Sequence, residues 1–305
     1  MDAVVVDSVV MTYRNGSIPA VNGVSFSVRR GELFGLIGPD GAGKTSLFRM
    51  LATLLLADSG TATIDGLDVV KEYKRIRTLL GYMPGRFSLY QDLSVEENLS
   101  FFATLFGTSI EKNRDLINDI YVHLEPFKDR RAGKLSGGMK QKLALCCALV
   151  HRPSVLLLDE PTTGVDPISR KEFWTMLDRL TAQGISILVS TPYMDEARRC
   201  DRIALMQSGQ IMSIDTPDNI VAGFDRPLYG VSGTHMYNLH RALTSDPAVE
   251  SCHTFGEMLH VTLHADDEAT LADLKQRLSS LALRDVTIVP IQPTIEDRFI
   301  RLMGR

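Results

Sequence analysis

Residues 38 to 45 read Gly38-Pro39-Asp40-Gly41-Ala42-Gly43-Lys44-Thr45. The stretch fits the pattern G-x-x-x-x-G-K-[ST], whose glycines let consecutive backbone N–H groups point at one anion. It follows the apolar run Leu33–Ile37, which suits a buried parallel strand, and it leads into Lys44–Leu55, which has helical apolar spacing. A plain glycine-rich turn is disfavoured by this context. The stretch therefore predicts a phosphate-binding loop within an α/β fold.

This loop predicts a site for the phosphates of a nucleotide and for Mg²⁺. The N-terminus of the following helix adds partial positive charge. Lys44 would contact the β- and γ-phosphates as a point charge, and the Thr45 hydroxyl would ligate Mg²⁺. We assign nucleotide binding to one continuous run: Gly38, Pro39, Asp40, Gly41, Ala42, Gly43, Lys44, Thr45 and Ser46.

A second apolar run ends in two acids and reads Val155-Leu156-Leu157-Leu158-Asp159-Glu160. Its apolar residues predict a buried strand. Asp159, at the carboxyl end, is placed to hold Mg²⁺, and Glu160 to polarise the attacking water as general base. Acids at strand ends are common, so this pattern gains its meaning from the phosphate-binding loop that precedes it.

The rest of residues 1–224 predicts strands that alternate with helices, and hence an α/β core with a parallel sheet. Ser94 and Glu97 fit a capping box at the start of a helical region that extends to Phe127. Strands are predicted at 4–6, 9–13, 23–30, 60–69, 185–190 and 203–206, with turns at 14–16 and 65–66. A helix is predicted to end at Val150, and another to span 167–183.

A composition shift near Ala222–Pro227 predicts a domain boundary after residue 224. Residues 225–305 then contain two strand–helix–strand halves, which predict a small α+β domain of ferredoxin-like type. The predicted strands are 228–231, 249–255, 258–263 and 286–291, and the predicted helices are His235–Thr244, Glu268–Leu281 and Thr294–Met303.

Composition narrows the class of protein. The 305 residues include 33 Lys plus Arg and 37 Asp plus Glu, giving a net charge of −4 and a pI near 6.0. This balance disfavours nucleic acid as the main partner. No apolar run approaches the roughly 18 residues of a membrane-spanning helix, and the N-terminus lacks the basic start of a secretory signal. The four cysteines lack metal-site spacing and indicate reduced core thiols.

Between the loop and the acidic strand lies Leu135-Ser136-Gly137-Gly138-Met139-Lys140-Gln141-Lys142. This run resembles LSGGQ, the signature of the ABC-type ATPases, with Met139 in place of the family's Gln. The resemblance covers residues 1 to about 220. It implies a P-loop NTPase core with a parallel sheet, an antiparallel β subdomain and a helical subdomain at about 86–150. It also implies that Ser136, Gly137 and Gly138 close over a nucleotide bound by a second subunit.

Further positions follow from the resemblance. Tyr13 lies where the family stacks an aromatic ring on adenine, although a core aromatic is the alternative. Asp166 resembles the acid of a loop at the dimer interface, and Tyr90–Asn98 the region that docks on cytoplasmic helices of membrane subunits. The ending Pro293–Phe299 and the run Tyr193–Ala197 resemble the drug- and antibiotic-exporter branch, the ABC-2 group. An amphipathic helix capped by Thr294 also accounts for the ending.

Two positions depart from the family pattern. The family has Gln where this chain has Gly85, after Tyr82-Met83-Pro84, and it has His where this chain has Pro192. Neither side chain offers a hydrogen bond. No His in the linear sequence is an obvious substitute. The transition state would therefore lose two polar contacts, while Glu160 remains.

The resemblance predicts the ATP-binding and ATP-hydrolysing subunit of an exporter whose membrane-spanning subunits are separate chains. Such a subunit would pair with itself or with a sister ATPase, in the cytoplasm at the inner face of the membrane. One alternative is a hydrolysis-impaired regulatory subunit beside a competent sister. Another is a soluble family member in translation or DNA repair, but the sequence lacks the second nucleotide domain or coiled-coil insertion that this would need.

Overall fold

The computed structural model describes residues 2–14, 16–265, 268–280 and 285–304. Contacts divide the chain into two compact units, Met1–Pro217 and Asp218–Arg305. This division lies earlier than the predicted boundary after residue 224, because helix α7 (Pro217–Ala222) leads into the second unit. A Cβ on Gly223, just after α7, would lie 3.2 Å from Arg298 of α10 (Ile295–Met303).

The first unit contains a six-stranded sheet in the order β10-β9-β3-β8-β7-β6. All neighbours pair in parallel except β10, which is antiparallel to β9. Because parallel strands end at one edge, the loops after β3, β7 and β8 meet there. The strands are β3 (Leu33–Ile37), β6 (Leu80–Met83), β7 (Val155–Asp159), β8 (Ser186–Thr191), β9 (Arg202–Gln207) and β10 (Gln210–Asp215). The short β6 and the partly exposed β10 were not predicted as strands.

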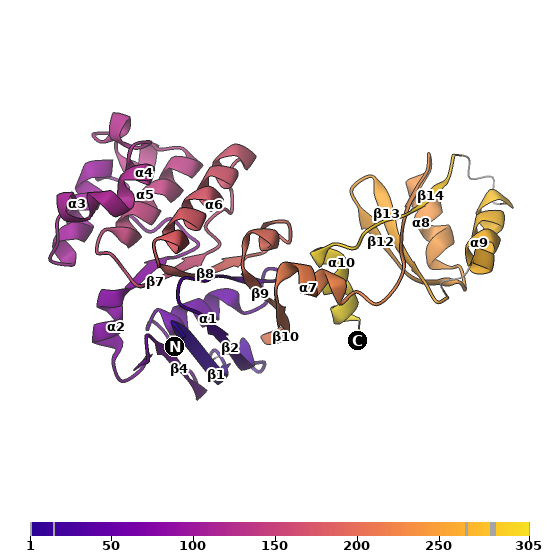
Figure 1. Cartoon of the computed structure of the whole chain (residues 1–305), viewed down its shortest axis with the longest axis horizontal. Helices are drawn as coiled ribbons and strands as arrows, with labels where there is room; N and C mark the ends of the chain where they lie inside the picture. Colours follow the sequence, from indigo (N-terminus) through magenta and orange to yellow (C-terminus); the bar gives the residue numbers. More distant parts are fainter. Residues whose placement is uncertain (1, 15, 266–267, 281–284, 305) are drawn as a thin grey trace. The chain divides into compact units, whose positions relative to one another are not determined.

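An antiparallel sheet in the order β2-β1-β4-β5 packs against α1 (Lys44–Leu51) in the same hydrophobic core (Figure 1). β1 (Val4–Met11) is one strand rather than the two predicted, with Ser8 at φ 50° in its middle. β2 (Val21–Val28) buries Val24, Phe26 and Val28, as predicted. β4 (Ser59–Ile64) and β5 (Leu67–Asp68) flank the predicted Asp65-Gly66 turn. Asn15, in the other predicted turn, lies outside the described residues.

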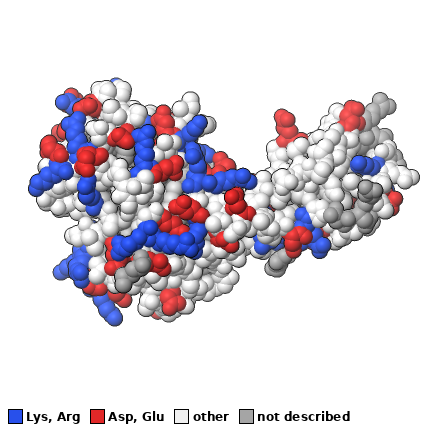
Figure 2. All heavy atoms as spheres, in the orientation of Figure 1, with Lys and Arg blue, Asp and Glu red and all other residues white. Residues whose placement is uncertain are grey.

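The helices of the first unit group on one side of the large sheet in Figure 1, apart from α1 and α2. α3 and α4 pack against α5, and the predicted capping box of Ser94 and Glu97 starts α3. Lys and Arg are intermixed with Asp and Glu on the visible face of this unit (Figure 2). The helices are α2 (Tyr73–Leu79), α3 (Val95–Leu105), α4 (Arg114–Tyr121), α5 (Gly137–Leu149) and α6 (Pro167–Ala182).

The second unit is an antiparallel sheet in the order β12-β13-β11-β14. Two strand–helix–strand halves with this order make the ferredoxin-like topology that the sequence predicts. α8 and α9 share one core with the sheet. The predicted end of α9, Leu281, lies outside the described residues. The elements are β11 (Leu228–Ser232), α8 (Met236–Thr244), β12 (Val249–Phe255), β13 (Met258–Leu263), α9 (Glu268–Ser280) and β14 (Thr287–Pro290).

Two further sequence expectations concern thiols and membrane spans. Cys146, Cys147 and Cys200 are buried free thiols, and their burial raises the pKa of each, as core thiols require. Cys252 is only partly buried, and its pKa is raised to about 11 by burial. None of the helices in the described part of the chain is long and apolar enough to cross a membrane.

Candidate active site

The phosphate-loop residues join β3 to α1, as the sequence predicts. Gly43 precedes α1 with φ 106°, a left-handed conformation that favours glycine. A Cβ there would lie 2.2 Å from the Ala20 carbonyl oxygen, and a Cβ on Gly38 would lie 2.1 Å from that of Met206. Around Gly41, no described atom lies within 4 Å of a Cβ position. The loop is packed on one side and open on the other, which fits a phosphate group against its N–H groups.

Lys44 is the first residue of α1, and its side chain is only 3% exposed. Its ammonium donates to the carbonyl oxygens of Gly38 at 2.8 Å and Pro39 at 3.0 Å. The Glu160 carboxylate lies 3.2 Å away. The cation is therefore held at the mouth of the loop, beside the residue predicted as the general base.

Thr45, Asp159 and Ser190 meet at one edge of the large sheet. Asp159 and Ser190 lie at the carboxyl ends of β7 and β8, and Thr45 lies in α1, which follows β3. Thr45 Oγ1 donates to Asp159 Oδ1 at 3.2 Å, and Ser190 Oγ donates to the same oxygen at 2.7 Å. Asp159 is 2% exposed and pairs with Ser190 in the parallel register of β7 and β8. Hydroxyl and carboxylate oxygens are ligands that Mg²⁺ prefers. Sequence reasoning missed Ser190, although its place at the end of a predicted strand was a usable signal.

Glu160 occupies a strained backbone position, with φ 51°. Its N–H donates to Ser190 Oγ at 3.0 Å and to the Ser190 carbonyl at 3.1 Å, so β8 fixes its backbone. Its side chain reaches Lys44 through Oε1, and the Thr163 hydroxyl lies 3.5 Å from Oε2. The predicted base therefore lies beside the phosphate loop on a rigid support.

Tyr13 lies beyond the end of β1 and is 46% exposed, so it is not the core aromatic of the alternative reading. Its hydroxyl is 3.0 Å from Ser46 Oγ, in the first turn of α1. An exposed ring tethered beside the phosphate loop is suited to contact a base bound there.

The signature residues lie at the start of α5, not at the phosphate loop. Ser136 is the N-cap of α5 and accepts from the Met139 N–H at 3.3 Å. A Cβ on Gly138 would lie 2.7 Å from Ser169 Oγ, so this glycine packs against the start of α6. Among the described residues, no hydrogen bond or ion pair joins Ser136–Gly138 to the phosphate loop. In Figure 1, α5 lies with α3, α4 and α6, away from α1.

The two departures from the family pattern lie at the same sheet edge. A Cβ on Gly85 would lie 3.1 Å from the Asp159 carbonyl oxygen, so this position is crowded. Pro192 directly follows Thr191, whose hydroxyl donates to the buried Glu196. Neither position supplies a polar side chain toward Asp159 or Lys44.

Arg170 of α6 holds the segment after Pro192. Its guanidinium lies 4.3 Å from the ring centroid of Tyr193 and 3.5 Å from Glu196 Oε1. The predicted interface acid, Asp166, caps α6 by accepting from the Ile168 and Ser169 N–H groups, and these bonds lower its pKa. Sequence reasoning did not find the role of Arg170, because nothing local links it to residues 193–196.

An apolar groove of about 590 Å³ opens between α1, α2, β6, α3 and α5. Leu54 and Leu105 line it and are 55% and 64% exposed. Tyr82 also lines the groove, and burial, followed by the Asp159 charge, raises the pKa of its phenol to about 12. Charged lining residues among those described are Arg77 and Arg86, without a carboxylate. The predicted docking segment, Tyr90–Asn98, lies beside it: Tyr90 contacts Phe101 of α3 edge to face, with ring centroids 4.9 Å apart.

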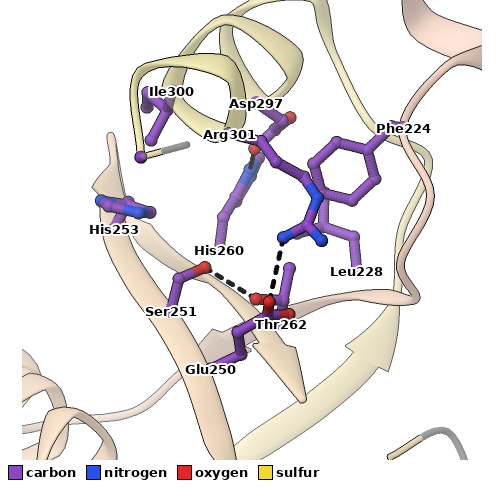
Figure 3. Close-up of a pocket in the computed structure, with 11 residues that line it drawn as sticks. Phe224, Leu228, Glu250, Ser251, His253, His260, Thr262, Asp297, Ile300 and Arg301 are labelled. Carbon is purple, nitrogen blue, oxygen red and sulfur yellow. Dashed lines mark hydrogen bonds and ion pairs between the residues drawn. The ribbon is translucent and has the colours of Figure 1, made fainter. Parts of the chain in front are cut away.

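A cavity of about 420 Å³ lies in the second unit, between β12, β13 and α10 (Figure 3). On β13, Leu259, Val261 and Leu263 face the core, so His260 faces α10 instead. His260 Nδ1 lies 2.6 Å from Asp297 Oδ1. Arg301 pairs with Asp225 at 2.5 Å and with Glu250 at 3.3 Å. The pairs that His260 and Glu250 make with Asp297 and Arg301 attach α10 to the sheet.

Comparison with known proteins decides the family. The sequence family described as ABC transporter matches residues 21–163. The Nod factor export ATP-binding protein I of Rhizobium sp. (strain N33) is 34% identical over 312 residues, which cover 100% of this chain and 99% of that protein. The chain belongs to the ATP-binding proteins of ABC transporters.

Another relative is the probable multidrug ABC transporter ATP-binding protein YbhF of Escherichia coli (strain K12), 42% identical over 291 residues. The match covers 94% of this chain and 49% of YbhF, so the chain spans about half the length of that relative.

Solved ABC cassettes share the fold. A structure described as the ATP-binding subunit of an ABC transporter has a TM-score of 0.66 at 28% identity, over 73% of this chain and 93% of its own. The dimeric structure of the bacterial ABC transporter cassette MJ0796 has a TM-score of 0.63 at 25% identity, over 70% of this chain and 98% of its own.

Proposed function

We propose that this ABC protein binds and hydrolyses ATP to drive an exporter whose membrane-spanning subunits are separate chains. The observation that carries the proposal is the convergence of Lys44, Asp159 and Glu160 at one sheet edge, beside an open phosphate loop. The relatives named for multidrug and Nod factor export support the direction of transport.

The side chains have separable roles in this reaction. Lys44 and the loop N–H groups bind the phosphates, and Thr45 and Asp159 are the residues that would hold Mg²⁺. A bound Mg²⁺ would neutralise charge on the phosphate oxygens. Glu160 accepts a proton from the attacking water. Tyr13 stacks on the adenine.

Pairing of two chains completes the site. Ser136–Gly138 lie at the N-terminus of α5, and no hydrogen bond in the described part of the chain joins them to their own phosphate loop. A helix N-terminus with a serine and two glycines suits phosphate binding, and the dimeric MJ0796 cassette supports an ATP sandwich between two copies. The second copy is this chain or a sister ATPase.

The apolar groove is the proposed dock for a cytoplasmic helix of a membrane subunit. It exposes Leu54 and Leu105 to solvent, an apolar surface that a partner would cover. Docking there places the chain at the inner face of the membrane.

A second candidate function is that of a hydrolysis-poor regulatory subunit. Gly85 and Pro192 favour it, because both lie at the sheet edge that carries Asp159 and neither offers a hydrogen bond. The retained Glu160 favours the active subunit.

Two measurements test the proposed function. The purified chain should hydrolyse MgATP, alone or with its sister subunit, and Glu160→Gln should remove that activity. In cells that contain the membrane subunits, the chain should be recovered with membranes, and Leu105→Asp should move it to the soluble fraction. Val122→Asp is the matched control, since Val122 is also apolar and 51% exposed but lies outside the groove. Hydrolysis that survives Glu160→Gln, or equal effects of the two Asp variants, would count against the proposal.

A further inference from the structure

The contact between Lys44 and Glu160 joins two residues whose roles in the reaction differ. Lys44 has three N–H donors. Two bind backbone carbonyls, and the only carboxylate within ion-pair distance among the described residues is that of Glu160, at 3.2 Å. Lys44 is 3% exposed and Glu160 22%. A cation this buried is costly unless it is paired, so Glu160 stabilises the folded loop.

We propose that Glu160 and the nucleotide phosphates compete for Lys44. The inference rests on the proposed function and deepens it by giving the catalytic base a second, regulatory role. When phosphates take over the Lys44 charge, the Glu160 carboxylate is released from the ammonium. Nucleotide binding thereby exchanges one anionic partner of Lys44 for another.

The surrounding contacts allow this exchange by side-chain movement alone. Glu160 directly follows β7, and its backbone N–H donates two hydrogen bonds to Ser190 of β8, which hold it in place. Among the residues that the structure describes, the carboxylate pairs only with Lys44, apart from the 3.5 Å contact between Oε2 and the Thr163 hydroxyl. Rotation about the side-chain torsions therefore frees Oε1 without shifting the strand.

Glu160→Gln tests the competition, because it removes the charge and keeps the shape. Without nucleotide, the variant leaves Lys44 buried and unpaired, so its Tm should fall. With MgADP, which cannot be hydrolysed, the variant should bind more tightly, by about 3- to 10-fold, because no carboxylate competes for the ammonium. Trapping of unhydrolysed ATP cannot explain a tighter affinity for MgADP.

Glu257→Gln is the matched control. Glu257 is an exposed glutamate in the turn between β12 and β13, outside the proposed ATP site. The substitution makes the same change of side chain and of net charge. We expect Glu257→Gln to leave both the Tm and the MgADP affinity unchanged. Equal tightening in both variants, or an unchanged Tm in Glu160→Gln, would overturn the competition.

A double-mutant cycle separates this inference from the proposed function. The Tm of Lys44→Met, Glu160→Gln and the double variant is measured without nucleotide. If the two side chains pair, the double variant should lose less than the sum of the single losses. Additive losses would overturn the pair even where MgADP binds normally. Failure of wild-type protein to bind MgADP would instead refute the ATP site.

Discussion

At the residue scale, the side chains of the candidate active site share hydrogen-bond partners. Asp159 Oδ1 accepts from both Thr45 and Ser190, and Ser190 also anchors the N–H of Glu160. One hydroxyl thus fixes the proposed Mg²⁺ ligand and the base together. A substitution at any of these positions is expected to disturb the others, so their effects should not add.

Lys44→Ala should abolish tight MgATP binding. The variant removes the cation that faces the phosphates at a buried position, and charge-assisted bonds are the strong ones. We expect the Kd for MgATP to rise by roughly 100-fold or more. Equilibrium binding of labelled ATP measures it, with Lys71→Ala as an exposed lysine control. An unchanged affinity would show that the loop is not part of the ATP site.

Pro192→His should raise the ATPase rate more than Gly85→Gln. Pro192 is half-buried, whereas a Cβ on Gly85 meets the Asp159 carbonyl at 3.1 Å, so glutamine enters only if the strand end shifts. Restoring one positioned polar contact to the transition state is expected to gain about 10- to 100-fold. Steady-state hydrolysis by the purified variants is the measurement. A wild-type rate of about 1 s⁻¹ or more without a partner would show that the native site needs neither side chain.

At the scale of single elements, local rules explain where helices begin. Ser94 and Thr294 each form a complete capping box, at α3 and α10. In α10 the capping residue Asp297 has a second partner, because its carboxylate also pairs with His260 of β13. The ending that resembles the ABC-2 group thus has a structural cause: it starts a helix and attaches it to the sheet.

Asp297→Ala should destabilise the second unit by about 2–3 kcal/mol, more than the roughly 1 kcal/mol expected of Thr294→Ala. The larger loss follows because Asp297 is buried and its removal leaves His260 without a partner. Urea unfolding monitored on both units is the measurement. Glu296→Ala, an exposed acid of the same turn, is the control. Equal effects of Asp297→Ala and Glu296→Ala would contradict the role of this pair.

At the scale of the whole molecule, the proposed ATP site has two halves, and no hydrogen bond or ion pair among the described residues joins them within one chain. The phosphate loop opens at the edge of the large sheet, and Ser136 caps a helix that packs with α3, α4 and α6. A site built from both halves needs two chains, and ATP would then act as part of their interface.

Glu160→Gln should dimerise in MgATP, alone or with a sister subunit, because ATP persists between the two chains. Sedimentation velocity with and without MgATP measures the dimer fraction. Adding Ser136→Asp should abolish the dimer and leave ATP binding intact. Aspartate keeps the N-cap of α5 but places a negative charge against the partner's phosphates. A dimer that survives Ser136→Asp would exclude the signature from the interface.

The sequence by itself determined the parts of this protein that depend on neighbours along the chain. The glycine-rich loop between an apolar strand and a helix, the acids at the end of β7, the capping boxes and the β12–β13 hairpin all follow local patterns of spacing and turn chemistry. Family resemblance added Ser136–Gly138 and the two departures at Gly85 and Pro192.

Only the tertiary structure decided which of these residues meet. Ser190, Arg170 and His260 acquire their partners through sheet register and helix packing, which join residues far apart in sequence. The Lys44–Glu160 pair has the same origin, because the parallel sheet places the ends of β3 and β7 at one edge.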